Sequence, residues 1–185
     1  MRASERRELI ARAAGRLFAQ QGYAGTRLDE VAAAAQVTKP IVYRHFASKK
    51  ALYLALLEKH EADLPTFFEG VDGQLGPEPL ARAILEHWLD YVRENQHAWL
   101  MLFRDSSGDD EIQAVRRRVS LRAREVVGGF VAQRPANRIP GDQIQPTAEL
   151  LVSGLAGLAL WWIDNPEVAK PVVVAVAVRM SEPAL

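Results

Sequence analysis

Residues 26–46, TRLDEVAAAAQVTKPIVYRHF, decide the fold of this 185-residue chain. Thr26 is suited to cap a first short helix, with Asp29 three residues later as the acid of a capping box. Thr38 is suited to cap a second helix, and Pro40 lies in its first turn, where a missing N–H group costs nothing. The stretch therefore predicts two short helices that are joined by a tight turn.

The two predicted helices differ in the face that they leave exposed. Leu28 and Val31 give the first helix an apolar face, and Ile41 and Val42 can pack inward from the second. The outer side of the second helix is then polar and basic, with Lys39, Tyr43, Arg44 and His45. This pattern is typical of a helix-turn-helix, whose second helix enters the major groove of DNA while the first crosses the backbone.

A longer pattern around this stretch resembles a known family. The residues T-x-L-D-E-V-A-A-A-A-Q-V-T-K-P-I-V-Y-R-H-F-x-S-K-K-A-L, within a match over residues 4–56, resemble the DNA-binding head of the TetR family of transcriptional repressors. The resemblance implies a helix-turn-helix DNA-binding domain at residues 1–47 and a ligand-binding and dimerisation domain at residues 48–185. Together they imply an all-α protein of about nine helices.

Charge is distributed unevenly along the chain. Residues 1–50 hold ten Lys or Arg and four Asp or Glu, a local charge of +6, although the whole chain has a net charge of zero. The rest of the chain therefore carries a charge of −6. A basic head on an acidic body is the electrostatic footprint of a protein that presents one end to nucleic acid, and this inference does not depend on the motif.

Composition excludes several functional classes. The chain has no cysteine, which rules out disulfide scaffolds, thiolate metal sites and cysteine catalysis and fits a reducing cytoplasm. Its four histidines are scattered, and no catalytic constellation is visible, so we expect neither an enzyme nor a bound metal or cofactor. The N-terminus lacks the apolar core of a signal peptide, and the apolar stretch 150–163 is shorter than the ~18 residues of a membrane span. A soluble protein is expected.

Helical periodicity and turn residues divide the rest of the chain. The expected helices are residues 4–21, a connecting helix 48–69 capped by Ser48, 80–95, 96–104, 109–133, a helix opened by Asp142 or Thr147 and ending at Asp164, and 171–180. Loops are expected at residues 69–79, 105–108 and 134–141. The run VVVAVAV in the last segment favours a strand by propensity, but the chain has no other strand signal to pair with it, so a helix is predicted.

Glycines mark special positions in two of these helices. Gly22 is expected to end the first helix at its C′ position. Gly128 and Gly129 interrupt the helix 109–133, either as a kink or to permit close packing.

The resemblance also implies which residues contact DNA. Those expected at base edges are Lys39, Pro40, Ile41 and Arg44, and those expected at phosphates or sugars are Thr26, Arg27, Thr38, Tyr43, His45 and Lys49. Arg44 can donate two hydrogen bonds to guanine, and Ile41 suits a thymine methyl group. The family has small residues where Pro40 and Ile41 stand, so the chain departs from the family pattern there.

Two groups of arginines leave alternatives open. Arg2, Arg6 and Arg7 form either a flexible arm that reaches phosphates or a solvated face. A second run in the body invites a further nucleic-acid site: Arg116, Arg117, Arg118, Arg122 and Arg124. We favour a solvated helix face whose arginines pair with neighbouring acids, because the surrounding body is acidic.

A ligand pocket is expected among the body helices 80–95, 96–104 and 109–133, beside the connecting helix. Its predicted lining is Ile84, Trp88, Tyr91, Trp99, Leu100, Phe103, Val115, Arg118, Val119 and Arg122. Most of these side chains are uncharged, which favours a neutral or aromatic effector; Arg104, Arg118 and Arg122 could meet a carboxylate. Aromatic residues at helical spacing are, however, more often core than ligand box.

The last two helices predict a dimer. The helix ending at Asp164 is apolar on more than one side and must be buried on more than one side. The predicted interface is Leu151, Gly154, Leu155, Gly157, Leu158, Trp161 and Trp162. A two-fold dimer would place two recognition helices about one DNA turn apart, ~34–36 Å, on a near-palindrome.

These patterns together predict a ligand-responsive transcriptional regulator, expected to be a repressor. It would bind a near-palindromic operator as a homodimer and be released by a small, mostly apolar effector. The alternative is a helical DNA-binding regulator that is gated by a protein partner and has no small-molecule effector.

Overall fold

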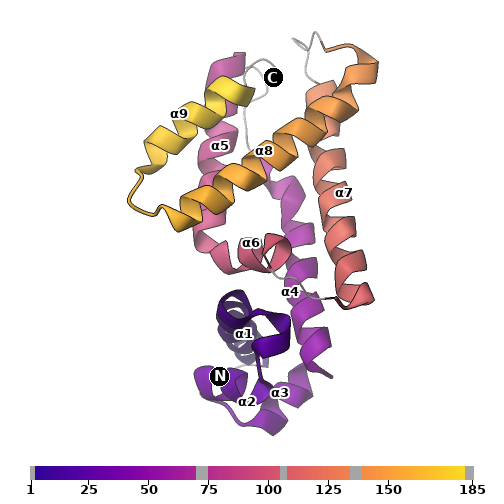
Figure 1. Ribbon diagram of the computed structural model, residues 1–185, viewed down its shortest axis with the longest axis vertical. Coiled ribbons are helices and arrows are strands. Elements are labelled where there is room, and N and C mark those ends of the chain that lie inside the picture. The colour runs from indigo at the N-terminus through magenta and orange to yellow at the C-terminus, as the bar shows by residue number, and fades with distance from the viewer. Residues whose placement is uncertain (1–2, 70–74, 105–107, 134–138, 182–185) are drawn as a thin grey trace. The chain divides into compact units, whose positions relative to one another are not determined.

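The computed structural model describes residues 3–69, 75–104, 108–133 and 139–181. Within these ranges the chain forms nine α-helices, two short 3-10 helices and no strand, which confirms the all-α prediction (Figure 1). The helices are α1 (Ala3–Gly25), α2 (Leu28–Ala34), α3 (Lys39–His45), α4 (Lys49–Asp63), η1 (Leu64–Phe68), α5 (Pro77–Glu94), α6 (Gln96–Phe103), α7 (Asp110–Ala132), η2 (Gly141–Gln143), α8 (Ile144–Asp164) and α9 (Lys170–Ser181).

The chain divides into two compact units. The first unit holds residues 1–61 and 97–119, and the second holds residues 62–96 and 120–185. The predicted boundary between residues 47 and 48 falls inside the first unit. The physical reason is Tyr53 of α4, which is fully buried and packs edge-on against Phe18 and Tyr23 of α1, with ring centroids 4.9 and 5.2 Å away.

The first unit is built on α1. Its buried residues Ile10, Ala13, Ala14 and Phe18 follow the predicted apolar stripe. Gly22 has φ 72° and ψ 172°, so the regular helix is interrupted there, where the sequence predicted its end. This backbone conformation is essentially restricted to glycine. One further turn leads to Gly25.

The start of α2 differs from the prediction by one residue. Arg27, not Thr26, is the N-cap residue, and Glu30, not Asp29, completes the capping box by accepting a hydrogen bond from the Arg27 N–H at 3.2 Å. Thr26 is only 1% exposed, and its hydroxyl donates to the Gly22 carbonyl at 2.9 Å. The predicted capping roles of Thr26 and Asp29 were therefore wrong. The Thr26 hydroxyl is used in the bond to Gly22, and the helix begins one residue later.

Other helix ends agree with the sequence in kind but not always in position. Ser48 caps α4, accepting a hydrogen bond from the Ala51 N–H at 3.0 Å. The connecting helix ends at Asp63 rather than residue 69, because Pro65 follows in η1 and supplies no N–H. Similarly, α5 begins at Pro77, three residues before the prediction.

The two C-terminal helices form close to their predicted positions. The predicted choice between Asp142 and Thr147 as the start of α8 was wrong, since α8 begins at Ile144 after the single turn η2. The valine run lies in α9 and is helical, as predicted. Parts of the predicted loops, at residues 70–74, 105–107 and 134–138, lie outside the described residues.

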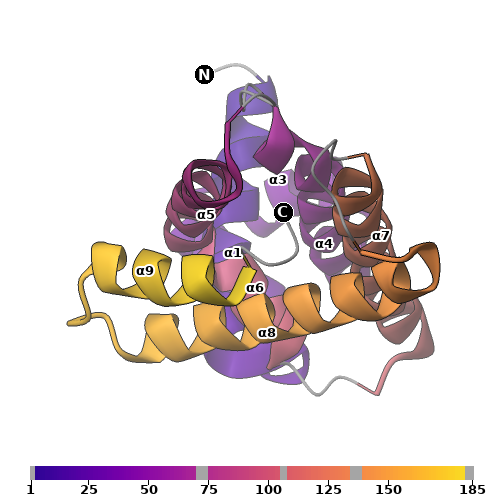
Figure 2. The ribbon, with the colours of Figure 1, turned by 90° about the horizontal axis from the view of Figure 1, so that it is seen from above.

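The core of the second unit lies between α5, α8 and α9. Each of these helices buries an apolar face, and α9 packs on α5 and folds back over α8 (Figure 2). The buried residues of α9 are Val173, Val174, Ala177, Val178 and Ser181. In the part of α7 that belongs to this unit, a Cβ on Gly128 would lie 3.5 Å from the Ala148 Cβ, an ordinary van der Waals distance, so the packing of α7 on α8 does not require this glycine.

Candidate DNA interface

The exposed face of α3 carries most of the residues predicted to contact DNA. Val42 is fully buried and Phe46 is 5% exposed, and these two residues fix α3 on the head. The outer face is formed by Thr38, Lys39, Pro40, Tyr43 and Arg44, which are exposed, and by Ile41 and His45, which are half-buried. The Arg44 side chain makes no ion pair or hydrogen bond with another residue in the described ranges. Its guanidinium therefore remains available for an external acceptor.

The turn between α2 and α3 is held by backbone geometry. Gln36 has φ 53°, in the left-handed region. Its N–H donates to the Ala33 carbonyl at 3.0 Å, and the Val37 N–H donates to the Ala32 carbonyl at 2.9 Å. This pair of bonds is a Schellman motif, which satisfies the last carbonyls of α2. The sequence did not predict this motif, because its left-handed position is occupied by Gln36 instead of the usual glycine.

Asp29 joins the first turns of α2 and α3. Its carboxylate lies 2.8 Å from the Lys39 ammonium and 3.7 Å from the Arg27 guanidinium. The hydrogen bond from Lys39 lowers the pKa of Asp29, and the same bond raises the pKa of Lys39. Two predicted DNA-contacting cations thus share one acid.

Arg7 holds the C-terminal end of α3. Its guanidinium donates to the His45 carbonyl at 2.6 Å and lies over the Phe46 ring, 4.1 Å from the centroid. Arg7 is an exposed residue, but these contacts hold its side chain against the head, so it is not part of a flexible arm. Arg6 is half-buried, and Arg2 lies outside the described residues.

His45 is held neutral by its surroundings. Its Nε2 atom is buried without a hydrogen-bond partner among the described residues. Burial and the nearby charges of Arg44, Arg6 and Arg7 lower the pKa of His45 below its ordinary value of 6.5. The positively charged form of His45 is therefore disfavoured within the head.

Lys49 uses its ammonium inside the first unit. It donates to the carbonyls of Tyr23 at 2.8 Å, Ala24 at 3.4 Å and Thr26 at 3.0 Å, and it lies 4.5 Å from the centre of the Tyr23 ring. An ammonium has three donors, so these bonds employ all of them. Together with the buried Thr26, Lys49 supports the connection between α1 and α2, a role that the sequence did not indicate.

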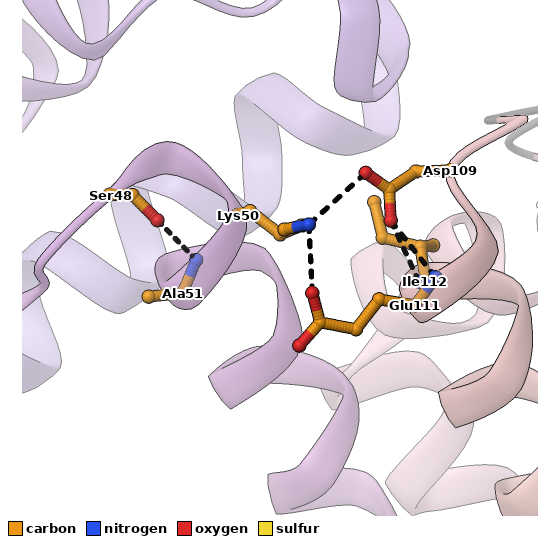
Figure 3. Close-up of polar contacts among 6 residues, drawn as sticks. All are labelled: Ser48, Lys50, Ala51, Asp109, Glu111 and Ile112. Carbon is orange, nitrogen blue, oxygen red and sulfur yellow. Dashed lines mark hydrogen bonds and ion pairs between the residues drawn. The ribbon is translucent and has the colours of Figure 1, made fainter.

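Lys50 joins the first turn of α4 to the first turn of α7 (Figure 3). Its ammonium lies 2.8 Å from Glu111 and 3.4 Å from Asp109, and Asp109 also accepts hydrogen bonds from the N–H groups of Glu111 and Ile112. The backbone bond from Ile112, followed by the contact with Lys50, lowers the pKa of Asp109, and the hydrogen bond with Glu111 raises the pKa of Lys50. Sequence reasoning missed this ion-pair group because its members are about 60 residues apart, beyond any local pattern.

The arginine run on α7 is mostly a face paired with acids. In the first unit Arg118 lies 3.0 Å from Glu61. In the second unit Arg122 pairs with Glu125, and Arg124 pairs with Glu149. The interpretation was wrong for Arg116, which is only 9% exposed. Its guanidinium donates to the Tyr53 hydroxyl and the Met101 carbonyl.

The residues predicted to bind ligand are divided between the two units. In the second unit Ile84 and Trp88 are buried, and the Tyr91 hydroxyl donates to Asp63 at 3.0 Å. Burial, reinforced by that carboxylate, raises the pKa of Tyr91. In the first unit the Trp99 and Phe103 rings are stacked 5.3 Å apart, and Phe103 is 43% exposed. Other members of the set lie in the first unit, with Leu100 half-buried and Val115 and Val119 buried.

An apolar stripe on α8 and α9 is exposed. On α8, Leu150 is 72% exposed and Trp161 is 48% exposed. Between them, Gly154 and Gly157 face open space, because a Cβ added to either would have no neighbouring atom within 4 Å. These four residues follow at spacings of four, three and four, so they share one helix face. The stripe continues on α9 with Val172, Val176 and Met180.

Trp162 does not belong to this exposed stripe, although it was predicted at the interface. It is 5% exposed, and its indole N–H donates to the Val168 carbonyl at 2.9 Å. The Arg93 guanidinium lies over its ring, 4.6 Å from the centroid. Trp162 therefore packs in the core of the second unit. Leu150, which was not among the predicted interface residues, is more exposed.

No group of three or more metal-binding side chains occurs in the ranges that the structure describes. The arrangement that these ranges do contain is a basic, exposed helix-turn-helix surface.

Comparison with known proteins agrees with this arrangement. Residues 10–56 match the family model of bacterial regulatory proteins, tetR family, and residues 77–181 match that of a tetracyclin repressor-like C-terminal domain. The HTH-type transcriptional activator FasR of Mycolicibacterium smegmatis is 29% identical over 163 residues, which cover 87% of this chain and 74% of FasR.

Two solved structures have a similar fold. AibR, in complex with isovaleryl coenzyme A and operator DNA, has a TM-score of 0.72 at 20% identity, over 96% of this chain and 98% of AibR. FadR from Bacillus subtilis, in complex with stearoyl-CoA, has a TM-score of 0.73 at 14% identity, over 95% of this chain and 96% of FadR.

Replacing Lys49 by Met tests its role inside the first unit. We expect a loss of about 1–3 kcal/mol in the free energy of unfolding, because three carbonyls lose a charged donor. Arg44→Met is the matched control, since that side chain is exposed and should change stability by less than about 0.5 kcal/mol. Chemical denaturation of both variants measures the difference. Equal stabilities of Lys49→Met and the wild type would contradict the supporting role.

Proposed function

This chain belongs to the TetR family of DNA-binding transcriptional regulators, a non-enzymatic class, and from that premise we propose that it is a cytoplasmic repressor. It would bind a near-palindromic operator as a homodimer and leave it when a small, mostly apolar effector binds. The observation that carries the proposal is the exposed basic face of α3 on a head of charge +6.

The proposed DNA contacts divide by exposure. Lys39, Pro40, Ile41 and Arg44 would lie at base edges, where Arg44 can form two hydrogen bonds with one guanine. The remaining exposed residues would contact the sugar-phosphate backbone: Arg27, Thr38 and Tyr43. Thr26 and Lys49, whose polar groups are used within the first unit, would position these residues rather than bind phosphate. His45 would act without a positive charge.

Substitution of Arg44 by Ala tests this docking. We expect operator affinity to fall by about 1–3 kcal/mol and discrimination at one base position to relax, because a bidentate contact is lost. The measurement is fluorescence anisotropy with a duplex that the wild-type protein has selected from a random pool. Arg117→Ala is the control, since Arg117 is an exposed arginine of α7 outside the proposed interface. Unchanged affinity and base preference in Arg44→Ala would exclude the proposed docking.

The proposed dimer uses the exposed apolar stripe of α8 and α9. Leu150, Gly154, Gly157 and Trp161 would face a second copy, with Leu151, Leu155 and Leu158 beside them. The range Gly141–Asp164 is also long and apolar enough, by length and composition alone, to cross a membrane. Pairing with a second copy accounts better for this stripe, because the same helix carries Glu149, which is ion-paired with Arg124.

Substitution of Gly157 by Leu tests the dimer. A side chain there meets open space within its own chain, so only a second copy would resist it. We expect the dimer dissociation constant to rise at least about tenfold, since overpacking costs about 1–3 kcal/mol. Sedimentation equilibrium measures it, with Gly129→Leu on α7 as the control. A wild-type protein that sediments as a stable monomer at micromolar concentration would refute the dimer.

The proposed effector is apolar, because most of the predicted ligand residues are uncharged. Within the first unit, the stacked pair of Trp99 and Phe103 supports this choice, since Phe103 remains 43% exposed. Solved structures of AibR and FadR contain isovaleryl coenzyme A and stearoyl-CoA. Their acyl chains are apolar, so acyl thioesters are the first compounds to try. Arg104 and Arg118, which lie in the same unit as the aromatic pair, are the candidate partners for the negatively charged coenzyme A group.

Stearoyl-CoA and isovaleryl coenzyme A serve as the probes of this proposal. We expect one of them to weaken operator binding by about 5–150-fold, the usual range of coupling between two sites. Phe103→Ala and Trp99→Ala should abolish this response and leave unliganded operator binding intact. If both variants instead lose operator binding in parallel with thermal stability, the aromatic pair is core. The alternative, a regulator gated by a protein partner, would then be favoured.

A further inference from the structure

An acid occupies the surface that the proposed function assigns to DNA. The Asp29 side chain is 50% exposed, and it lies between the exposed cations Lys39 and Arg27. A carboxylate at this position repels the phosphates of DNA, so it lowers the affinity of the surface for any duplex. The presence of this acid on the DNA-binding surface therefore requires a physical explanation.

The local structure of α2 supplies only part of that reason. The capping box is completed by Glu30, whose carboxylate accepts the Arg27 N–H. Asp29 and Glu30 both lie in the first turn of α2, where the helix dipole favours an acid, so this effect does not depend on Asp29 alone. Asp29 is therefore not needed to begin the helix. Its short contact is instead with the next helix, at 2.8 Å from the Lys39 ammonium.

We propose that Asp29 is a specificity-determining residue of the DNA interface, which holds the Lys39 ammonium in place for base edges and keeps it from phosphates at arbitrary sequence. The inference rests on the proposed function of the α3 face. Asp29 acts here as a positioning residue, because it works through Lys39.

The chemistry of the lysine side chain explains how one acid can do this. A free lysine is a point charge on a flexible four-carbon stem, and it can follow a phosphate on any duplex. Once Asp29 accepts one of its three N–H groups, two donors remain, which suffice for the N7 and O6 acceptors of a guanine. Moving the ammonium to a phosphate would break the contact with Asp29. The contact between Asp29 and Lys39 therefore lowers the affinity for non-specific DNA more than the affinity for the operator.

The test compares Asp29→Asn with the wild type on two duplexes of equal length, one of random sequence and one selected by the wild-type protein. On the random duplex we expect about two- to fivefold tighter binding, the range of an exposed ion pair. The plot of log affinity against log salt concentration should steepen by roughly 0.9, as for one additional phosphate neutralised. On the selected duplex the gain should be smaller, so the ratio of specific to non-specific affinity falls.

Three variants separate positioning from a simple change of charge. Glu8→Gln on α1 removes the same charge from an exposed residue, and it should leave the affinity ratio unchanged. In a Lys39→Gln background, Asp29→Asn should lose most of its effect on the salt dependence, because Lys39 is the cation closest to Asp29; a small residual effect would come from Arg27, 3.7 Å from Asp29. Asp29→Glu retains the carboxylate and should restore most of the ratio.

Two outcomes would overturn the inference. One is an equal gain of Asp29→Asn on both duplexes, and the other is an undiminished effect in the Lys39→Gln background. Either result would mean that Asp29 only repels phosphates at any sequence and does not position Lys39. If Arg44→Ala also leaves DNA binding unchanged, the proposed function itself fails; a strong effect of Arg44→Ala beside a silent Asp29→Asn overturns the role of Asp29 alone.

Discussion

The first compact unit depends on the buried side chain of Tyr53. Its ring packs against Phe18 and Tyr23, and its hydroxyl donates to the Met101 carbonyl at 3.2 Å while accepting a hydrogen bond from Arg116. One residue of α4 thereby joins α1, α6 and α7. A buried guanidinium is tolerated only where polar groups surround it, so the Tyr53 hydroxyl and the Met101 carbonyl make this packing possible. Within the first unit, the contacts of Tyr53 therefore link the head to α4, α6 and the start of α7.

Charged groups of the first unit are used for support as much as for DNA. Lys49 binds three carbonyls at the junction of α1 and α2, and Lys50 binds Asp109 and Glu111 at the start of α7. Two consecutive residues in the first turn of α4 therefore hold it to different neighbours: Lys49 contacts the connection between α1 and α2, and Lys50 contacts the start of α7. A basic count of ten in residues 1–50 overstates the charge that is available to phosphates, and the ion pair of Asp29 reduces it further.

Much of the fold could be predicted from the sequence, because helix caps, turns and helical spacing depend on residues close together in the chain. Pro40 in the first turn of α3, Ser48 at the cap of α4 and Gly22 at the interruption of α1 each act within about four residues, the range over which caps and turns are decided. The exposed face of α3 followed from helical spacing once Val42 was assigned to the core. The one-residue error at the start of α2 arose because Thr and Arg could both precede that helix.

The sequence by itself determined the class of fold, the order of the helices, the helix-turn-helix and the side of α3 that faces outward, because periodicity and capping act between near neighbours. Only the tertiary structure decided which polar groups are occupied and which apolar residues are exposed. Arg116 was predicted in a solvated face and is buried, and Trp162 was predicted at an interface and lies in a core. Lys49 finds its carbonyl partners 23 to 26 residues away. Contacts at that separation depend on how helices pack, and no local pattern in the chain encodes them.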